Sequence, residues 1–192
     1  MKQNELSQRR KEQMAASLKK LMAKKSIQKI SIQELADDCG MNRYTFYYHF
    51  QDIYDLLRWT FSRDFETLFS NQKRCTNWEE WLRIILQYLK DNAAFCKAAI
   101  NSVGRDALRD LCVSDLQYFM ELMLKDIKGD RSVPEDYLNF LASFYLEALC
   151  GTLIQWILSD MNIPMESLIR YLHITLEKTL DSALTQAEKE LN

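Results

Sequence analysis

A short polar and aromatic segment, residues 42–49, carries the side chains of this sequence that are best suited to contact a polyanion. It is written NRYTFYYH and contains no carboxylate. Arg43 can pair bidentately with guanine or hold a phosphate, and Asn42 can read adenine or cap a helix. The methyl and hydroxyl groups of Thr45 suit thymine or a phosphate oxygen. This chemistry predicts contact with double-stranded DNA.

Two short helices joined by a tight turn are predicted to position these side chains. Ser31 is followed three residues later by Glu34, which is the capping-box pattern that starts a helix. Gly40 suits a turn that needs a positive φ, and Asn42 is a good N-cap for the second helix. Residues 31–50 are therefore predicted to form a helix-turn-helix.

The predicted motif divides into an outer surface and an inner framework. The residues predicted to contact DNA are Ser31, Gln33, Asn42, Arg43, Tyr44, Thr45, Tyr47, Tyr48 and His49. The inward-facing residues are predicted to be Ile32, Leu35, Ala36, Met41, Phe46 and Phe50. Alternatives stay open for several of these residues. Tyr47 is core, a phosphate contact or both, since a buried ring can expose its hydroxyl. Arg43, Tyr48 and His49 are either DNA contacts or an ordinary solvated helix face.

Composition favours an all-α protein. The chain has 192 residues, of which 47% are apolar and 27% charged, with four glycines and two prolines. This is too apolar for a disordered chain and too poor in turn residues for a many-stranded β fold.

Charge is distributed unevenly along the chain, whose net charge is −2. Residues 1–60 hold eleven Lys and Arg against seven Asp and Glu, whereas residues 61–192 hold fourteen against twenty. The basic N-terminal third fits a nucleic-acid partner.

Apolar periodicity predicts about nine helices in two parts. The first part, residues 1–52, is a three-helix helix-turn-helix head, and the second, residues 53–192, is a larger helical bundle for ligand binding and dimerisation. Besides the short helices of the motif, helices are predicted at 5–24, from 53 to about 70, and at 78–90, 93–102, 105–128, 134–161 and 165–191, with a loop at 71–77.

Several other classes of protein are disfavoured. The sequence has no nucleophile–base pair and no phosphate-binding glycine loop, so an enzyme is not predicted. The five cysteines form no C-x-x-C pair. Our interpretation of the spacing is that neither His49 nor His173 has a Cys or carboxylate neighbour suited to bind the same metal ion, so no metal or cofactor is predicted. We expect no segment to approach the roughly twenty apolar residues that a membrane span requires. A cytoplasmic protein without membrane contact is therefore predicted.

The motif resembles the TetR family of bacterial regulators. The resemblance rests on GMNRYTFYYHF followed by DIYDLL and covers about residues 10–57. It implies a regulator, a repressor in our prediction, that binds a pseudo-palindromic operator as a homodimer. The sequence departs from the family at Ile53, where many members carry a lysine that reaches a DNA phosphate, and at Tyr44, where a small residue is common. DIYDLL and the aromatic body are similar to the branch that includes regulators of dihydroxyacetone kinase operons.

The resemblance also implies roles for the C-terminal part, which would sense a small-molecule effector or a partner protein. Ligand-pocket candidates are Trp59, Phe65, Phe95, Tyr118, Phe119, Met123, Tyr145 and Trp156, although most aromatic residues of a bundle are plain core. Dimer-interface candidates are Phe140, Phe144, Ala148, Gly151, Thr152, Leu172, Leu176 and Leu180, with intramolecular core as the alternative for each. The alternative function is a helical adaptor or co-regulator that acts through protein–protein contacts without binding DNA.

Overall fold

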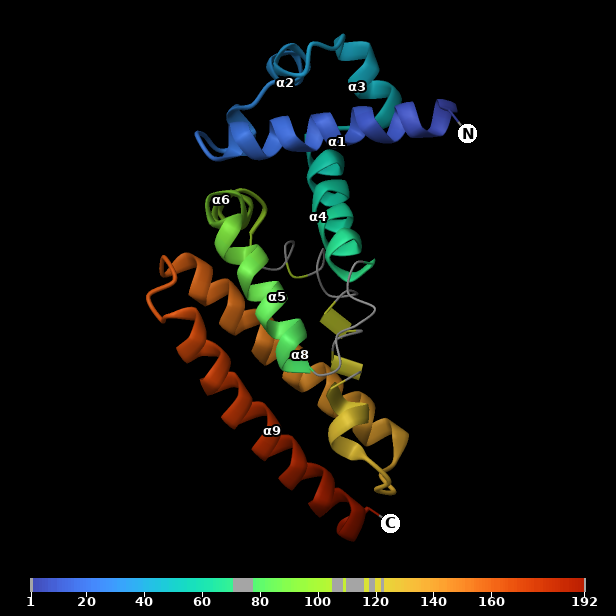
Figure 1. The fold of residues 1–192 in the computed structure, drawn as a ribbon, viewed down its shortest axis with the longest axis vertical. Coiled ribbons are helices and arrows are strands. Elements are labelled where there is room, and N and C mark those ends of the chain that lie inside the picture. The colour runs from blue at the N-terminus through green and yellow to red at the C-terminus, as the bar shows by residue number, and fades with distance from the viewer. Residues whose placement is uncertain are drawn as a thin grey trace. The chain divides into compact units, whose positions relative to one another are not determined.

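The computed structural model describes residues 2–70, 78–104, 109, 116–117, 120–121 and 123–191, and the predicted all-α fold is confirmed (Figure 1). The described residues contain no strand. Their helices are α1 (Lys2–Met22), the 3₁₀ turn η1 (Ile27–Lys29), α2 (Ile32–Asp38), α3 (Arg43–His49), α4 (Ile53–Ser70), α5 (Trp78–Asp91), α6 (Ala93–Val103), α8 (Glu135–Leu158) and α9 (Met165–Glu190). The predicted loop at 71–77 and most of the predicted helix at 105–128 lie outside the described residues.

The chain divides into two compact units, which are described separately. The first unit is Met1–Asn71 with Asn92–Leu111, and the second is Gln72–Asp91 with Cys112–Asn192. Helices α4 and α6 therefore belong to the same unit as the helix-turn-helix. The functional division into residues 1–52 and 53–192 stays a prediction.

Helix α1 is the base on which the first unit is assembled. It contacts α2, α3, α4 and α6, and Figure 1 shows it running crosswise beneath α2 and α3. Met14, Leu18 and Met22 recur at helical spacing and are almost completely buried. Burial of this apolar stripe fixes one face of α1 inward, so its basic residues remain on the other positions.

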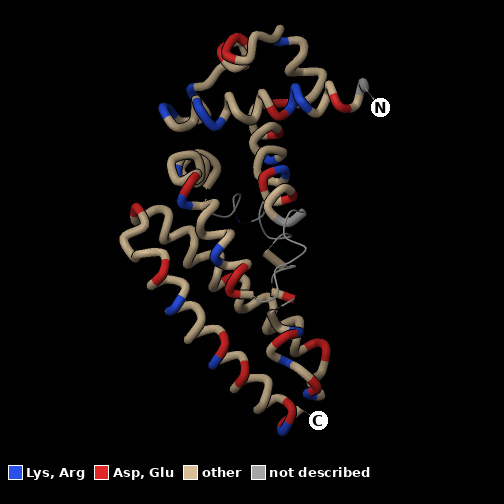
Figure 2. The backbone as a smooth tube through the Cα atoms, viewed as in Figure 1, with Lys and Arg blue, Asp and Glu red and all other residues tan. Residues whose placement is uncertain are grey.

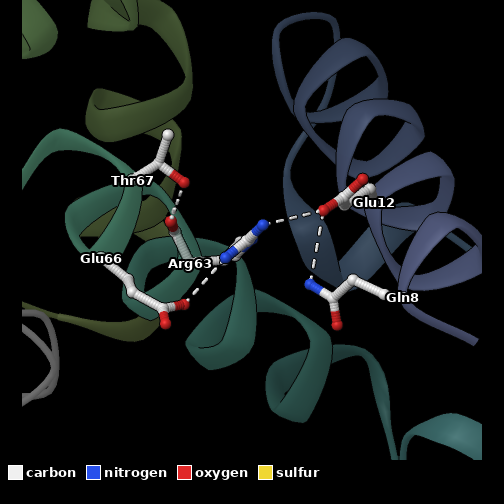
Figure 3. A network of polar contacts seen from close by, with 5 residues as sticks. All are labelled: Gln8, Glu12, Arg63, Glu66 and Thr67. Carbon is white, nitrogen blue, oxygen red and sulfur yellow. Dashed lines mark hydrogen bonds and ion pairs between the residues drawn. The ribbon is translucent and has the colours of Figure 1, made fainter. Parts of the chain in front are cut away.

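An ionic network fastens α4 to α1 (Figure 3). The guanidinium of Arg63 on α4 lies 3.1 Å from Glu12 on α1 and 3.0 Å from Glu66 on its own helix. Gln8 donates to the same Glu12 carboxylate, and the Thr67 hydroxyl donates to the Arg63 carbonyl. Hydrogen bonds to the two carboxylates raise the pKa of Arg63 above its ordinary value. These side chains are partly exposed, so the network orients the helices more than it stabilises them.

A second connection joins α1 to both α4 and α6. Lys19 on α1 forms an ion pair with Asp64 on α4, and its ammonium lies 5.5 Å from the centre of the Phe95 ring on α6. Phe95 in turn stacks on Phe61 of α4, with ring centres 4.8 Å apart. Three helices thus converge on Lys19, which is consistent with α6 belonging to the first unit.

The second unit has its apolar core along α5 and α9, which contact each other. The leucines that recur every four residues along α9 point inward, with Leu172, Leu176 and Leu180 all buried. Helix α8 is linked to α9 by a hydrogen bond of 2.9 Å between the Tyr145 and Thr179 hydroxyls.

Helix α8 ends three residues earlier than the sequence pattern predicts. The prediction extended it to Met161, but it ends at Leu158, and Asp160 and Met161 have φ of 54° and 56°. The Trp156 indole donates to the Ile163 carbonyl at 2.8 Å across this turn. Two consecutive residues in the left-handed region cannot continue a helix, and periodicity alone does not reveal them.

Helix α8 is also more apolar than the sequence analysis allowed. Its 24 residues include an 18-residue window of mean hydropathy 1.4, of which 39% is buried. The expectation that no stretch approaches the length and composition of a membrane span is therefore wrong for α8. A core or interface helix of a soluble protein meets the same criteria of length and composition.

We predict that Phe46→Ala lowers the free energy of unfolding by about 3–5 kcal/mol, because Phe46 is completely buried between the helices of the first unit. The matched control is Tyr48→Ala on the same helix, which should change it by less than about 0.5 kcal/mol because Tyr48 is exposed. Urea unfolding followed by circular dichroism measures both. Equal losses in the two variants would contradict the packing described.

Candidate DNA-binding interface

The first helix of the motif is started by the predicted cap, but only half of the capping box is formed. The Ser31 hydroxyl accepts a hydrogen bond from the Glu34 N–H at 3.1 Å. The Glu34 carboxylate turns away to Lys25, 2.6 Å from its ammonium, instead of returning to the cap. Leu35 and Ala36 are buried as the sequence predicted, whereas Ile32, which was also predicted to face inward, is only partly buried.

The turn between the two helices depends on backbone conformation at Gly40. Its φ is +62°, and its N–H donates to the Asp37 carbonyl at 3.0 Å. The next N–H, that of Met41, donates to the Ala36 carbonyl at 2.8 Å. A Cβ at Gly40 would meet no atom within 4 Å. The glycine is therefore needed for its left-handed conformation and not for lack of space.

Helix α3 presents one aromatic face inward and another outward. The Asn42 side chain caps it by accepting from the Tyr44 N–H at 2.9 Å. Phe46 and Phe50, four positions apart, are buried. Positions 44 and 48 lie on the opposite side of a helix with 3.6 residues per turn, and Tyr44 and Tyr48 are 76% and 77% exposed.

Arg43 and Tyr47 form the flank of this outer face. The Arg43 guanidinium lies 5.8 Å from the centre of the Tyr47 ring, within cation–π range. Tyr47 is half exposed, and its ring also meets Phe46 edge-on at 5.5 Å. Tyr47 is thus both an anchor to the core and a surface residue. We refer to Arg43, Tyr44, Tyr47 and Tyr48 together as the α3 outer face.

His49 lies at the other edge of α3, beside positive charge from α1. Burial lowers its pKa below the ordinary 6.5, and the nearby Lys11 and Arg10 lower it further. Lys11 itself lies 5.7 Å from the Phe50 ring and 5.8 Å from the Trp59 ring. Sequence analysis did not single out Lys11, because the contact joins positions about forty residues apart.

The acidic residues near the motif are engaged by neighbours. Asp37 accepts from the Gln33 amide at 2.7 Å, and Asp38 accepts from Ser17 and pairs with Lys20. The hydrogen bond to Lys20 is the main reason that the pKa of Asp38 lies below its ordinary value. Figure 2 shows Lys and Arg distributed along α1, and α3 itself has no carboxylate. The ion pair with Lys20 therefore reduces the repulsion of a polyanion by Asp38.

The departure at Ile53 has a structural consequence. Ile53 begins α4 and is buried, so its side chain contributes to packing and not to the surface. The start of α4 is capped by Asp52, which accepts from the Asp55 N–H at 2.8 Å. The phosphate contact that many family members make with a lysine at this position has no counterpart at Ile53.

The ligand-pocket candidates come from both units of the chain. Trp59, Phe65 and Phe95 belong to the first unit, where the Trp59 ring meets Phe50 at 5.8 Å. Met123, Tyr145 and Trp156 belong to the second unit, while Tyr118 and Phe119 lie outside the described residues. Three hollows formed by described residues of the second unit are lined by other side chains than these six described candidates.

The dimer-interface candidates separate into exposed and buried groups. The α8 candidates are all exposed: Phe140, Phe144, Ala148, Gly151 and Thr152. The α9 candidates, Leu172, Leu176 and Leu180, are core of the second unit, which is the alternative that sequence analysis left open. The large apolar residues that α9 does expose are Tyr171 and Ile174.

The interpretation that both histidines lack a carboxylate neighbour at ligand spacing is wrong for His173. His173 does have a carboxylate at ligand spacing, because Glu177 follows it by one helical turn and its oxygen lies 3.0 Å from Nδ1. Glu79 of α5 lies 2.6 Å from the same nitrogen. The i, i+4 spacing was visible in the sequence, whereas Glu79 is brought in only by the fold.

A capped helix-turn-helix in the first unit and a helical second unit define a class of all-α transcriptional regulators. Residues 16–58 match the family described as bacterial regulatory proteins, tetR family, and residues 76–178 match its transcriptional regulator C-terminal region. The second match covers more than half of the chain. The chain belongs to the TetR family, whose members are regulators and not enzymes.

Known relatives agree with this assignment. The chain is 32% identical over 82 residues to the HTH-type dhaKLM operon transcriptional activator DhaS of Lactococcus lactis subsp. lactis (strain IL1403), a match over 43% of this chain and 44% of that protein. The chain thus matches less than half of that relative's length. The solved structure of a dihydroxyacetone kinase operon activator DhaS is similar with a TM-score of 0.72 and 21% identity, over 93% of this chain and 97% of the other. A TetR transcriptional regulator from Streptococcus agalactiae 2603V gives a TM-score of 0.62 and 22% identity, over 92% and 98% of the two chains. At these identities the two structures establish the fold.

We predict that the lowered pKa of His49 makes the protein less stable in mild acid. The unfolded chain binds this proton near the ordinary pKa of 6.5, and the folded chain binds it only at lower pH. The contribution is therefore fully present above about pH 6.5 and is lost as the pH falls through the folded pKa. Urea unfolding between about pH 8 and pH 5 should show wild type losing stability relative to His49→Gln as the pH falls. Other titrating groups cancel in this difference, so parallel curves would contradict the environment assigned to His49.

Proposed function

We propose that this protein is a dimeric DNA-binding regulator of bacterial transcription whose α3 outer face contacts a pseudo-palindromic operator in the cytoplasm. The observation that carries the proposal is the geometry of α3. Burial of Phe46 and Phe50 leaves a cation and three tyrosine side chains exposed, on a helix without carboxylates. Arginine and tyrosine are donors to phosphate oxygens and base edges, and a capped helix of this kind fits the major groove.

The exposed face of α8 supports dimerisation. The rings of Tyr137, Phe140 and Phe144 are stacked in a row, with centres 6.1 and 6.0 Å apart. Phe140 and Phe144 are 58% and 57% exposed in the single chain. A contiguous apolar patch of this kind marks an interaction surface, and a twofold axis makes one patch serve both subunits. A second copy on α8 also accounts for the high hydropathy of this helix.

A twofold dimer matters for DNA binding because it sets the spacing of the two recognition helices. Two copies of α3 placed about 34–36 Å apart would enter successive major grooves on one side of the duplex. The operator is then an inverted repeat.

The second unit is the proposed receiver of the regulatory signal, which is a small molecule or a partner protein. A hollow of about 560 Å³ lies between α8 and α9, lined by residues that include Tyr137, Thr179 and Gln186. It is large enough for a small metabolite. A ligand that binds one arrangement of the second unit better than another would change the population of the DNA-binding form.

The direction of regulation has two candidates. Sequence analysis predicted repression, and that stays a prediction. The two DhaS relatives are named as activators, which favours activation of an operon instead. Transcript levels of the adjacent genes in a deletion strain separate the two, because loss of a repressor raises them and loss of an activator lowers them.

We predict that Arg43→Ala weakens DNA binding by about 1–3 kcal/mol, which is roughly fivefold to 150-fold. The duplex is selected from a random pool with the wild-type protein, and affinity is measured by gel shift at several salt concentrations. Wild type should show a steep decrease of affinity with salt, because cationic contacts to phosphate release counterions.

The matched control is Arg170→Ala, which removes an exposed arginine from α9 and should leave DNA affinity unchanged. Equal affinity of wild type and Arg43→Ala would remove Arg43 from the interface. Failure of the wild-type dimer to select any duplex would favour the adaptor alternative, in which the protein acts through protein contacts alone.

We predict that Phe144→Asp converts the dimer to a monomer, because a charge would be buried in the proposed α8 interface. Leu6→Asp is the control, since it places the same charge on an exposed apolar position of α1. Sedimentation equilibrium gives both masses. A Phe144→Asp variant that remains dimeric would place the interface elsewhere.

A further inference from the structure

The second unit holds a compact cluster of metal-ligating side chains that the proposed DNA-binding function does not use. His173 and Glu177 lie on one face of α9 because they are four positions apart, and Glu79 is in the first turn of α5. The imidazole Nδ1 is 2.6 Å from Glu79 and 3.0 Å from Glu177. One ligand atom from each residue lies within 4.8 Å of the other two.

The imidazole is held in a fixed orientation toward the two carboxylates. The Trp78 ring stacks on it with centres 5.7 Å apart and planes at 11°. The Nδ1 atom is buried, and despite its short distances to Glu79 and Glu177 it makes no hydrogen bond of good geometry among the described residues. One N–H can in any case serve only one of two carboxylates. The cluster therefore has more electron-pair donors than its own protons can satisfy.

The surroundings of the cluster are negative and open on one side. Glu79 and Glu177 also line a hollow of about 490 Å³, whose other charged groups are Asp126, Asp181 and Lys178. Asp181 is paired with Arg131. With Asp181 compensated by Arg131, three carboxylates remain against one lysine in the hollow, which favours a cation. The hollow also leaves room for water on a metal bound at its edge.

We propose that Glu79, His173 and Glu177 bind a first-row divalent transition metal, with Zn²⁺ as the best match, and so join α5 to α9. Zn²⁺ accepts imidazole nitrogen and carboxylate oxygen at about 2.0–2.2 Å, which requires ligand atoms about 3–3.5 Å apart in tetrahedral geometry. Small side-chain rotations supply this spacing from the distances found here. Mg²⁺ and Ca²⁺ prefer oxygen ligands alone, and soft ions such as Cu⁺ prefer thiolates, so neither class suits a His–Glu–Glu set.

The test is isothermal titration of the full-length, tag-free chain with ZnCl₂ after removal of metal by a chelator. We expect one Zn²⁺ per chain, an increase in melting temperature on adding Zn²⁺, and at least tenfold weaker binding in both His173→Ala and Glu177→Gln. Glu177→Gln keeps the side-chain shape, so it remains informative if His173→Ala folds poorly. The control His49→Gln removes the other histidine of the chain and should bind Zn²⁺ like wild type.

Co²⁺ absorption distinguishes the proposed ligands from the cysteines, since thiolate ligands add an intense charge-transfer band that nitrogen and oxygen ligands do not. The proposal is overturned if wild type shows no binding at millimolar metal, if both cluster variants bind as tightly as wild type, or if the Co²⁺ spectrum shows the thiolate band. Each of these readouts is independent of DNA binding.

Discussion

The burial of Phe46 and Phe50 is the constraint on which the proposed interface depends. Helix α3 has only seven residues, so burying Phe46 within it and Phe50 at its C-cap leaves no freedom in what the other side presents. Tyr44 and Tyr48 face outward for this reason. The two caps and the left-handed conformation of Gly40 define where the helix begins and how it follows α2. The chemistry of the surface is thus a consequence of the packing beneath it.

Helix α1 connects this packing to the rest of the first unit. Its buried stripe supports α2 and α3, while Lys19, Glu12 and their partners attach α4 and α6. Partly exposed ion pairs contribute little free energy, but they favour one orientation of two helices over others. A change in the position of α4 would therefore have to break or shift the contacts of Arg63 and Lys19. In this way the same helix that supports the DNA-binding motif can respond to its neighbours.

Local features were predictable from sequence because their causes are local. Residues within a few positions of one another determine the Ser31 and Asn42 caps, the Gly40 turn and the inward positions of Leu35 and Phe46.

Features that depend on tertiary structure were not predictable. Glu79 and His173 meet only through the packing of α5 on α9, and Lys11 reaches His49 only across the head. The same holds for the α9 leucines, since periodicity identified their stripe but could not show whether it faces its own chain or a second one. The turn at residues 160–161 shows a further limit of sequence-based prediction, because no glycine marks its left-handed backbone conformation.

The central claim, that residues 31–50 form the DNA-contacting surface, is tested most directly by amide hydrogen exchange of the protein with and without a saturating concentration of the selected DNA duplex. Peptides covering residues 31–50 should exchange more slowly in the complex, while the exchange of peptides covering α9 should not change. Protection confined to the second unit, or no protection within residues 31–50 at saturation, would contradict the account.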